Sequence, residues 1–166
     1  MEKVISIGKQ NFESLRENHY FFVDKSHFIK DWWENGDEIT LITRPRRFGK
    51  TLNMSMLDCF FSNKYAARGD LFEGLGVWKE EKYRELQGKY PVIFLSFAAV
   101  KADQLSEAKI QIKQQIARVY EENRYLLDGD LLSGNEKKAY NEVNLHMGDA
   151  EAAAALNNMS MYLARY

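Results

Sequence analysis

Hydrophobic residues spaced three or four positions apart predict helices in four stretches of the chain. The first helix opens after Asp24, which has the side chain of an N-cap, and ends near Gly36. The second begins at Lys50, and its apolar residues cover nearly every side, which is typical of a helix buried against a sheet. The third follows Ser106, and the fourth follows Asp149. These four stretches supply most of the predicted helical core.

Shorter helices are predicted before and between the long ones. Residues 11–17 are polar and compatible with a helix, and a charged helix is expected near 79–86. Ser133 and Glu136 have the spacing of a capping box, which predicts a helix from there to about His146.

Three runs rich in β-branched and aromatic residues predict strands, at 20–23, 38–43 and 91–97. Residues 91–97 are apolar without alternation, as in a strand that is covered on both faces of a parallel sheet. Pro45 ends the middle strand, because proline has no backbone N–H to donate and restricts the backbone conformation of the residue before it. The order of helices and strands predicts an α/β fold, a parallel sheet flanked by helices.

Composition narrows the functional classes. The sequence has 166 residues, the length of one ordinary domain, and a formal net charge of -1 from 23 basic and 24 acidic residues. This balance excludes a highly cationic nucleic-acid or membrane-surface protein. The single Cys59 cannot form an internal disulfide, and no cluster of cysteines and histidines suits zinc. Without an apolar run long enough for a signal peptide or a membrane span, we expect a cytoplasmic protein with no membrane partner.

The segment 43–51 reads TRPRRFGKT and lies between a predicted strand and a predicted helix. Its end matches the P-loop pattern G-x-x-x-x-G-K-[ST], although Arg44 occupies the place of the first glycine. A polyphosphate can bind the backbone N–H groups at a helix N-terminus, and Gly49 lets the backbone approach it closely. Lys50 is expected to reach the β- and γ-phosphates as the catalytic lysine, and the Thr51 hydroxyl is expected to bind Mg²⁺.

The predicted nucleotide-binding residues are contiguous. They are Arg44, Pro45, Arg46, Arg47, Phe48, Gly49, Lys50, Thr51 and Leu52. An alternative interpretation remains open, in which the chain is a binding module without catalysis. Its basic loop, with Arg44, Arg46 and Arg47, would then bind either the phosphate backbone of a nucleic acid or the surface of a protein partner. The bulk charge of -1 argues against the nucleic-acid alternative.

Three segments together resemble the N-terminal portion of the AAA-ATPase-like family of bacterial and archaeal proteins. They are FVDKS at 22–26, TRPRRFGKTL at 43–52 and YPVIFLSF at 90–97, and the resemblance extends from about Ile5 to the C-terminus. Arg44 is in keeping with it, because the P-loop of this family commonly reads R-P-R-R-F-G-K-[ST]. The resemblance implies a P-loop NTPase-like fold that binds ATP and Mg²⁺, with Lys50 and Thr51 as the phosphate and metal contacts. It assigns no role to Asp24 and Lys25.

Longer members of that family continue into a Walker B strand that ends in acidic residues, and many have a C-terminal nuclease-like domain of the PD-(D/E)XK type. The resemblance therefore implies that residues 1–166 are a partial domain, truncated before the Walker B strand, that binds ATP with weak or no hydrolysis by itself. Its expected parts are an N-terminal segment 1–37, the P-loop strand and helix 38–62, and a second strand with helices 90–166. An open sheet edge predicts self-association or pairing with the missing C-terminal half.

Overall fold

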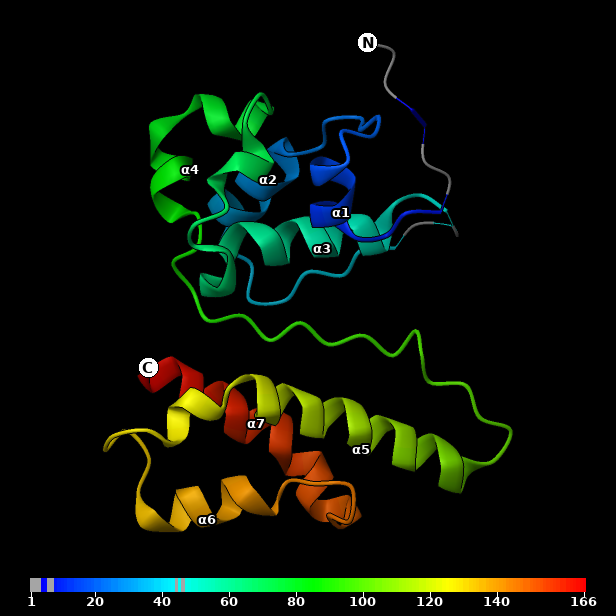
Figure 1. The fold of residues 1–166 in the computed structure, drawn as a ribbon, viewed down its shortest axis with the longest axis vertical. Helices are drawn as coiled ribbons and strands as arrows, with labels where there is room; N and C mark the ends of the chain where they lie inside the picture. The colour runs from blue at the N-terminus through cyan, green and yellow to red at the C-terminus, as the bar shows by residue number, and fades with distance from the viewer. Residues whose placement is uncertain (1–3, 6–7, 44, 46) are drawn as a thin grey trace. The chain divides into compact units, whose positions relative to one another are not determined.

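The computed structural model describes residues 4–5, 8–43, 45 and 47–166 (Figure 1). The chain divides into two compact parts, which we call the N-terminal unit (Met1–Val92) and the C-terminal unit (Ile93–Tyr166). Each unit has its own cluster of buried side chains.

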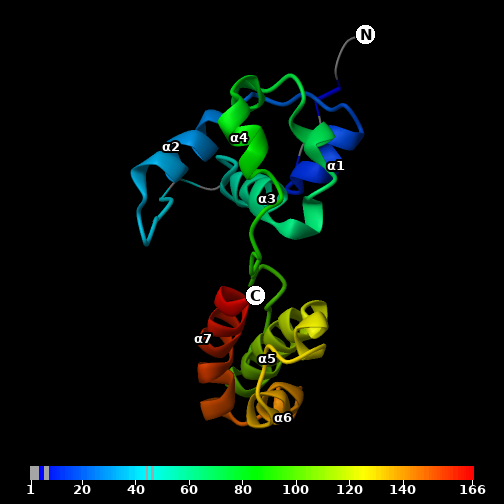
Figure 2. The ribbon, with the colours of Figure 1, turned by 90° about the vertical axis from the view of Figure 1, so that its left-hand side faces the viewer.

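The N-terminal unit contains four α-helices and three short 3-10 helices. They are α1 (Phe12–Glu17), α2 (His27–Asn35), α3 (Lys50–Phe61), η1 (Asn63–Tyr65), η2 (Gly69–Phe72), η3 (Gly76–Lys79) and α4 (Glu81–Leu86). Figure 2 shows α3 with α2 on one side and α1 on the other. The arrangement makes α3 the helix around which this unit is built.

Aromatic rings fill the core of the N-terminal unit. Phe12, Phe60 and Phe72 are fully buried and come from α1, α3 and η2. The ring centroids of Phe12 and Phe72 are 5.2 Å apart, and those of Phe60 and Phe72 are 5.1 Å apart. Aromatic pairs at such distances add to the free energy gained from burial alone. The short helix η2 is therefore held in place by contacts with residues distant in sequence.

The C-terminal unit consists of α5 (Leu105–Glu122), η4 (Arg124–Leu127), α6 (Gly134–Glu142) and α7 (Asp149–Arg165), as Figure 1 shows. Two buried tyrosines connect the three α-helices. The Tyr120 hydroxyl donates to the carbonyl of Ala155 at 2.8 Å, and the Tyr140 hydroxyl donates to the carbonyl of Tyr120 at 2.6 Å. Each phenol thus buries its ring while its polar end remains hydrogen-bonded.

The predicted parallel sheet is wrong: the part of the chain that the structure describes is helical and contains no strand. One parallel bridge, between Ser62 and Tyr90, is the only strand-like pairing among the described residues. Composition can favour a strand, but a strand forms only where a neighbour supplies hydrogen bonds. In the predicted strand at 38–43, Ile39 and Leu41 are instead 87% and 83% exposed.

The apolar run at 91–97 has a different explanation. Val92 packs against the core of the N-terminal unit, whereas Ile93 and Leu95 pack against the core of the C-terminal unit. The run is therefore the end of one unit and the start of the next. Residues of one continuous apolar segment thus pack into two different cores. From sequence alone, such a segment is indistinguishable from a buried strand.

Most of the predicted helices are confirmed, with shifts at their ends. Gly36 ends α2 in the left-handed conformation, and Ser133 and Glu136 form the expected capping box of α6. The third long helix begins at Leu105 with Gln104 as N-cap, so Ser106 is not its cap. The helix that was expected to reach His146 ends at Glu142.

No helix in the described parts of the chain combines the length and apolarity needed to cross a membrane.

Candidate functional site

The candidate site lies where α3 begins, and two helices converge there. Lys25, just before α2, has its Nζ 4.0 Å from where a Cβ on Gly49 would be, and Gly49 is the N-cap of α3. At the other ends of these helices, the Trp33 ring stacks on Phe61 with centroids 5.6 Å apart. The helices α2 and α3 therefore run in the same direction, and the segment between them returns the chain to the start of α3.

The backbone at the start of α3 turns through two left-handed residues. Gly49 has φ 76° and ψ 18°, and Arg47 has φ 70°. Glycine adopts this conformation without strain, but arginine does so at a cost of about 1 kcal/mol or more. The first α-helical hydrogen bond of α3 runs from the N–H of Asn53 to the carbonyl of Gly49, at 2.9 Å. Since the N-cap is glycine, no side chain caps the first turn.

The side chains of the loop have different surroundings. The Lys50 ammonium donates a hydrogen bond to the carbonyl of Pro45 at 3.1 Å, across the turn. The Thr51 side chain is exposed, and Phe48 is 60% exposed. Leu52 is partly buried against the core of the N-terminal unit. The leucine therefore anchors the first turn of α3, while lysine and threonine remain at its surface.

The residues before α2 are fixed by contacts with η3. One carboxylate oxygen of Asp24 accepts from the backbone N–H of Ser26 at 2.8 Å, and the other accepts from the N–H of Gly76 at 2.7 Å. The hydroxyl of Ser26, which is fully buried, accepts from the N–H of Val77 at 3.1 Å. Asp24 was expected to be the N-cap of the helix, but that position belongs to Ser26. Both residues tie the start of α2 to a segment about fifty residues later.

These hydrogen bonds also determine the charge of Asp24. Partial burial would raise the pKa of the carboxyl group, but the hydrogen bonds from Ser26 and Gly76 outweigh it and lower the pKa below its usual value. Asp24 is therefore a carboxylate at neutral pH. Its charge lies next to Lys25 in the sequence, and both oxygens already accept backbone hydrogen bonds.

A comparison with protein-family models gives one match, described as Predicted AAA-ATPase, over residues 6–159. The match includes both the DKS segment at 24–26 and the loop at 43–52, and it extends over most of the chain. The chain belongs to the AAA-ATPase-like family.

A separate comparison with curated proteins finds a similar protein from Azotobacter chroococcum mcd 1, which is described as "Uncharacterized protein in vnfD 5'region". The two are 35% identical over 96 residues, which cover 57% of this chain and 17% of that protein. The chain therefore spans about a sixth of the length of this relative. No solved structure matches the chain.

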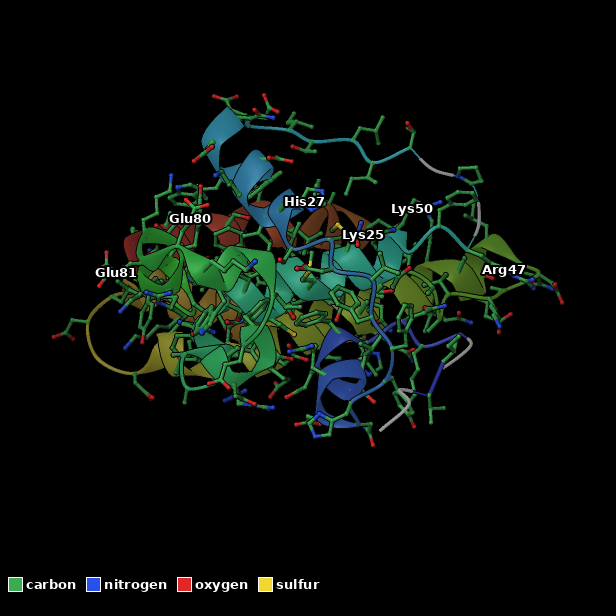
Figure 3. All side chains as sticks on the ribbon, turned by 90° about the horizontal axis from the view of Figure 1, so that it is seen from above. Lys25, His27, Arg47, Lys50, Glu80 and Glu81 are labelled. Carbon is green, nitrogen blue, oxygen red and sulfur yellow. The ribbon has the colours of Figure 1, made fainter. Side chains whose placement is uncertain are left out.

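In this member of the AAA-ATPase-like family, the structure brings together part of the predicted loop. Pro45, Gly49 and Lys50 meet in one turn, and Figure 3 shows Lys25 and Lys50 at the same end of α3, with Arg47 farther out on the loop. Arg44 and Arg46, which were predicted to bind the nucleotide, lie outside the described residues.

Sequence reasoning missed the position of Lys25. The family resemblance singled out Asp24 and Lys25 without a role, and their distance of about twenty-five residues from the loop gives no spacing rule to follow. The proximity of Lys25 to Gly49 depends on the parallel course of α2 and α3, which is a tertiary feature. No group of three or more histidine, cysteine, aspartate or glutamate residues in the described ranges has a geometry that suits a metal ion.

Proposed function

We propose that this chain binds Mg-ATP through residues 44–52, with the polyphosphate at the start of α3. The observation that supports this most directly is the left-handed Gly49 at the N-cap of a helix that opens with Lys50. A helix N-terminus without a capping side chain presents backbone N–H groups and the positive end of the helix dipole to an anion. The family to which the chain belongs supports the same proposal.

The residues at this turn suit the parts that a P-loop needs. Lys50 already has its ammonium at the turn, within hydrogen-bonding distance of the Pro45 carbonyl, and bound phosphate oxygens would replace that acceptor. The exposed hydroxyl of Thr51 is on the first turn of α3, where a P-loop threonine binds Mg²⁺. The metal would neutralise the charge of the β- and γ-phosphates. Lys50 and Thr51 are therefore the residues that would hold the nucleotide and its metal.

The proposal concerns binding. Lys50 as a catalytic residue, and weak or absent hydrolysis by this chain, remain predictions. A substitution at Lys50 separates binding from the fold, because its side chain contributes nothing to the aromatic core.

The test is a titration of a fluorescent ATP analogue, with Mg²⁺, into the wild-type chain, Lys50→Ala and Lys89→Ala. Lys89 is an exposed lysine of the same unit and provides a control with the same change of charge. We expect saturable binding by the wild type and by Lys89→Ala, and binding at least about tenfold weaker for Lys50→Ala, since hydrogen bonds to a charged group are lost. Equal affinity of all three proteins, or no binding by a folded wild type, would overturn the proposal.

The nucleic-acid alternative uses the same loop and predicts a different experimental result. Arg47 is exposed on the loop and is the one arginine of the predicted basic cluster that lies within the described residues. If the loop binds nucleic acid and not ATP, single-stranded or duplex DNA would bind with an affinity that falls with salt as about three phosphate contacts require. ATP would then fail to displace it.

A further inference from the structure

We propose that Lys25 is a second phosphate-binding residue of the nucleotide site, acting beside Lys50 from a different segment of the chain. This inference rests on the proposed function and assigns a role to a residue outside the loop. Its basis is the juxtaposition of Lys25 and Gly49 at the start of α3, together with the hydrogen bonds that hold the backbone on both sides of Lys25.

The Lys25 ammonium lies over the turn itself. An added Cβ on Gly49 would be 4.0 Å from Lys25 Nζ, and among the described residues this amine is the one atom of a distant residue within 4 Å of that position. A phosphate bound against the Gly49 backbone would therefore lie within reach of this amine. Figure 3 shows Lys25 and Lys50 near the same end of α3.

The backbone on both sides of Lys25 is anchored. Asp24 accepts from the N–H groups of Ser26 and Gly76, and the buried hydroxyl of Ser26 accepts from Val77. These contacts fix the backbone of the DKS segment against η3, so that only the Lys25 side chain can still change its conformation. A side chain that starts from a fixed backbone loses less entropy when it binds a ligand.

The ammonium of Lys25 is available for a ligand. Of the side chains that the structure describes, none forms a hydrogen bond or an ion pair with Lys25 Nζ, and the side chain is exposed. The neighbouring carboxylate of Asp24 is occupied by two backbone donors. Lys25, Lys50 and the positive end of α3 together make this turn attractive to a multiply charged anion.

The chemistry of the ligand follows from this charge. A single phosphate can be satisfied by the N–H groups of the turn and one lysine, whereas a di- or triphosphate offers further oxygens to a second lysine. We therefore expect Lys25 to contribute to the binding of ATP and inorganic tripolyphosphate, and to contribute little to the binding of AMP.

The test compares Lys25→Gln, Lys25→Arg and Lys89→Ala with the wild type. A fluorescent ATP analogue with Mg²⁺ measures direct binding, and displacement by tripolyphosphate and by AMP measures recognition of the phosphates. We expect Lys25→Gln to bind ATP and tripolyphosphate about tenfold more weakly, because one charge-assisted contact is lost. Lys25→Arg and Lys89→Ala should bind within about twofold of the wild type, since both keep a cation at Lys25.

The outcomes distinguish the two proposals. If Lys50→Ala loses binding and Lys25→Gln does not, the role of Lys25 is overturned and the proposed function stands. If the folded wild type binds neither ATP nor tripolyphosphate, both are overturned. Far-UV circular dichroism and the thermal midpoint show whether each variant is folded. If Lys25→Gln is unfolded, Lys25→Ala takes its place: binding about tenfold weaker than that of Lys25→Arg supports the proposal, and affinity equal to that of Lys25→Arg overturns it.

Discussion

The two units of the chain differ in what their long-range hydrogen bonds hold in place. In the N-terminal unit, hydrogen bonds join residues far apart in sequence, such as Asp24 to Gly76 and Ser55 to Phe12. In the C-terminal unit, the long-range bonds join one helix to another, as from Tyr120 to Ala155 and from Tyr140 to Tyr120, and a local capping box at the start of α6 joins Ser133 to Glu136. The helices of the N-terminal unit are joined by loops and 3-10 helices that such bonds fix, whereas the C-terminal unit consists mainly of α5, α6 and α7 packed around one core.

This difference explains why the candidate site is in the N-terminal unit. The left-handed turn at Arg47 and Gly49 is held only if the segments around it are fixed, and long-range contacts fix the start of α2 beside it. Helices stabilised by their own caps and by a shared core need no such loop. The following predictions test whether the two units are as independent, and as different, as these contacts indicate.

The largest expected effect is on the aromatic core. Phe72→Ala removes a fully buried ring that contacts Phe12, Phe60 and Trp78. We expect the free energy of unfolding of the N-terminal unit to fall by about 3–5 kcal/mol, through lost burial and the cavity that remains. All three tryptophans of the chain belong to this unit, so tryptophan fluorescence during urea denaturation follows it alone.

The matched control is Met159→Ala in the C-terminal unit. Met159 is also fully buried, and its truncation should cost about 2–5 kcal/mol there. The tryptophan transition should then remain at its wild-type urea concentration, while amide exchange in α5 and α7 becomes faster. A shift of one common transition by both variants would show that the units unfold together, which contradicts the division.

A smaller effect is expected at two glycines. Gly49→Ala forces a Cβ into a left-handed residue with φ 76°, so it should destabilise the N-terminal unit by about 1 kcal/mol. Gly134, the first residue of α6, has open space where a Cβ would lie. Gly134→Ala should therefore be neutral or stabilise the C-terminal unit by up to about 1 kcal/mol. Thermal denaturation of both variants measures the difference, and equal effects would refute the conformational argument.

The smallest effect is the response of the C-terminal unit to acid. Hydrogen bonds from Lys109 and Lys113 lower the pKa of Asp149 to about 2, and those from Arg165 and Ser133 lower the pKa of Glu136 to about 2. A carboxylate with a lowered pKa stabilises the folded state above its unfolded pKa of about 4. That stabilisation is lost as the pH falls from about 4 to about 2.

The measurement is amide exchange or circular dichroism of the C-terminal unit in urea at several pH values. Asp149→Asn should make the dependence between about pH 4 and 2 shallower, because one of the two groups that titrate there is gone. The Asp149 carboxylate is exposed and that of Glu136 is partly exposed, so high salt should reduce the effect in the wild type. A wild-type profile that is flat in this range would contradict the assigned ion pairs.

Helices were predicted well because their signals are local. The apolar residues lie within the helices that their spacing specifies, and the cap residues Gly36 and Ser133 lie directly next to them. Strands were predicted wrongly because pairing depends on a neighbour from elsewhere in the chain. Residues 38–43 have the composition of a strand, but they lie in an extended segment that returns the chain from α2 to α3 without strand pairing.

In the candidate site, too, some residues could be predicted from the sequence and one could not. The sequence by itself determined the glycine and lysine of the loop, because a phosphate-binding turn before a helix needs those residue types at that spacing. Only the tertiary structure decided that Lys25 lies at the same turn. The parallel course of α2 and α3 and the hydrogen bonds of Asp24 and Ser26 to η3 place it there, and interactions across about fifty residues leave no periodic trace in a sequence.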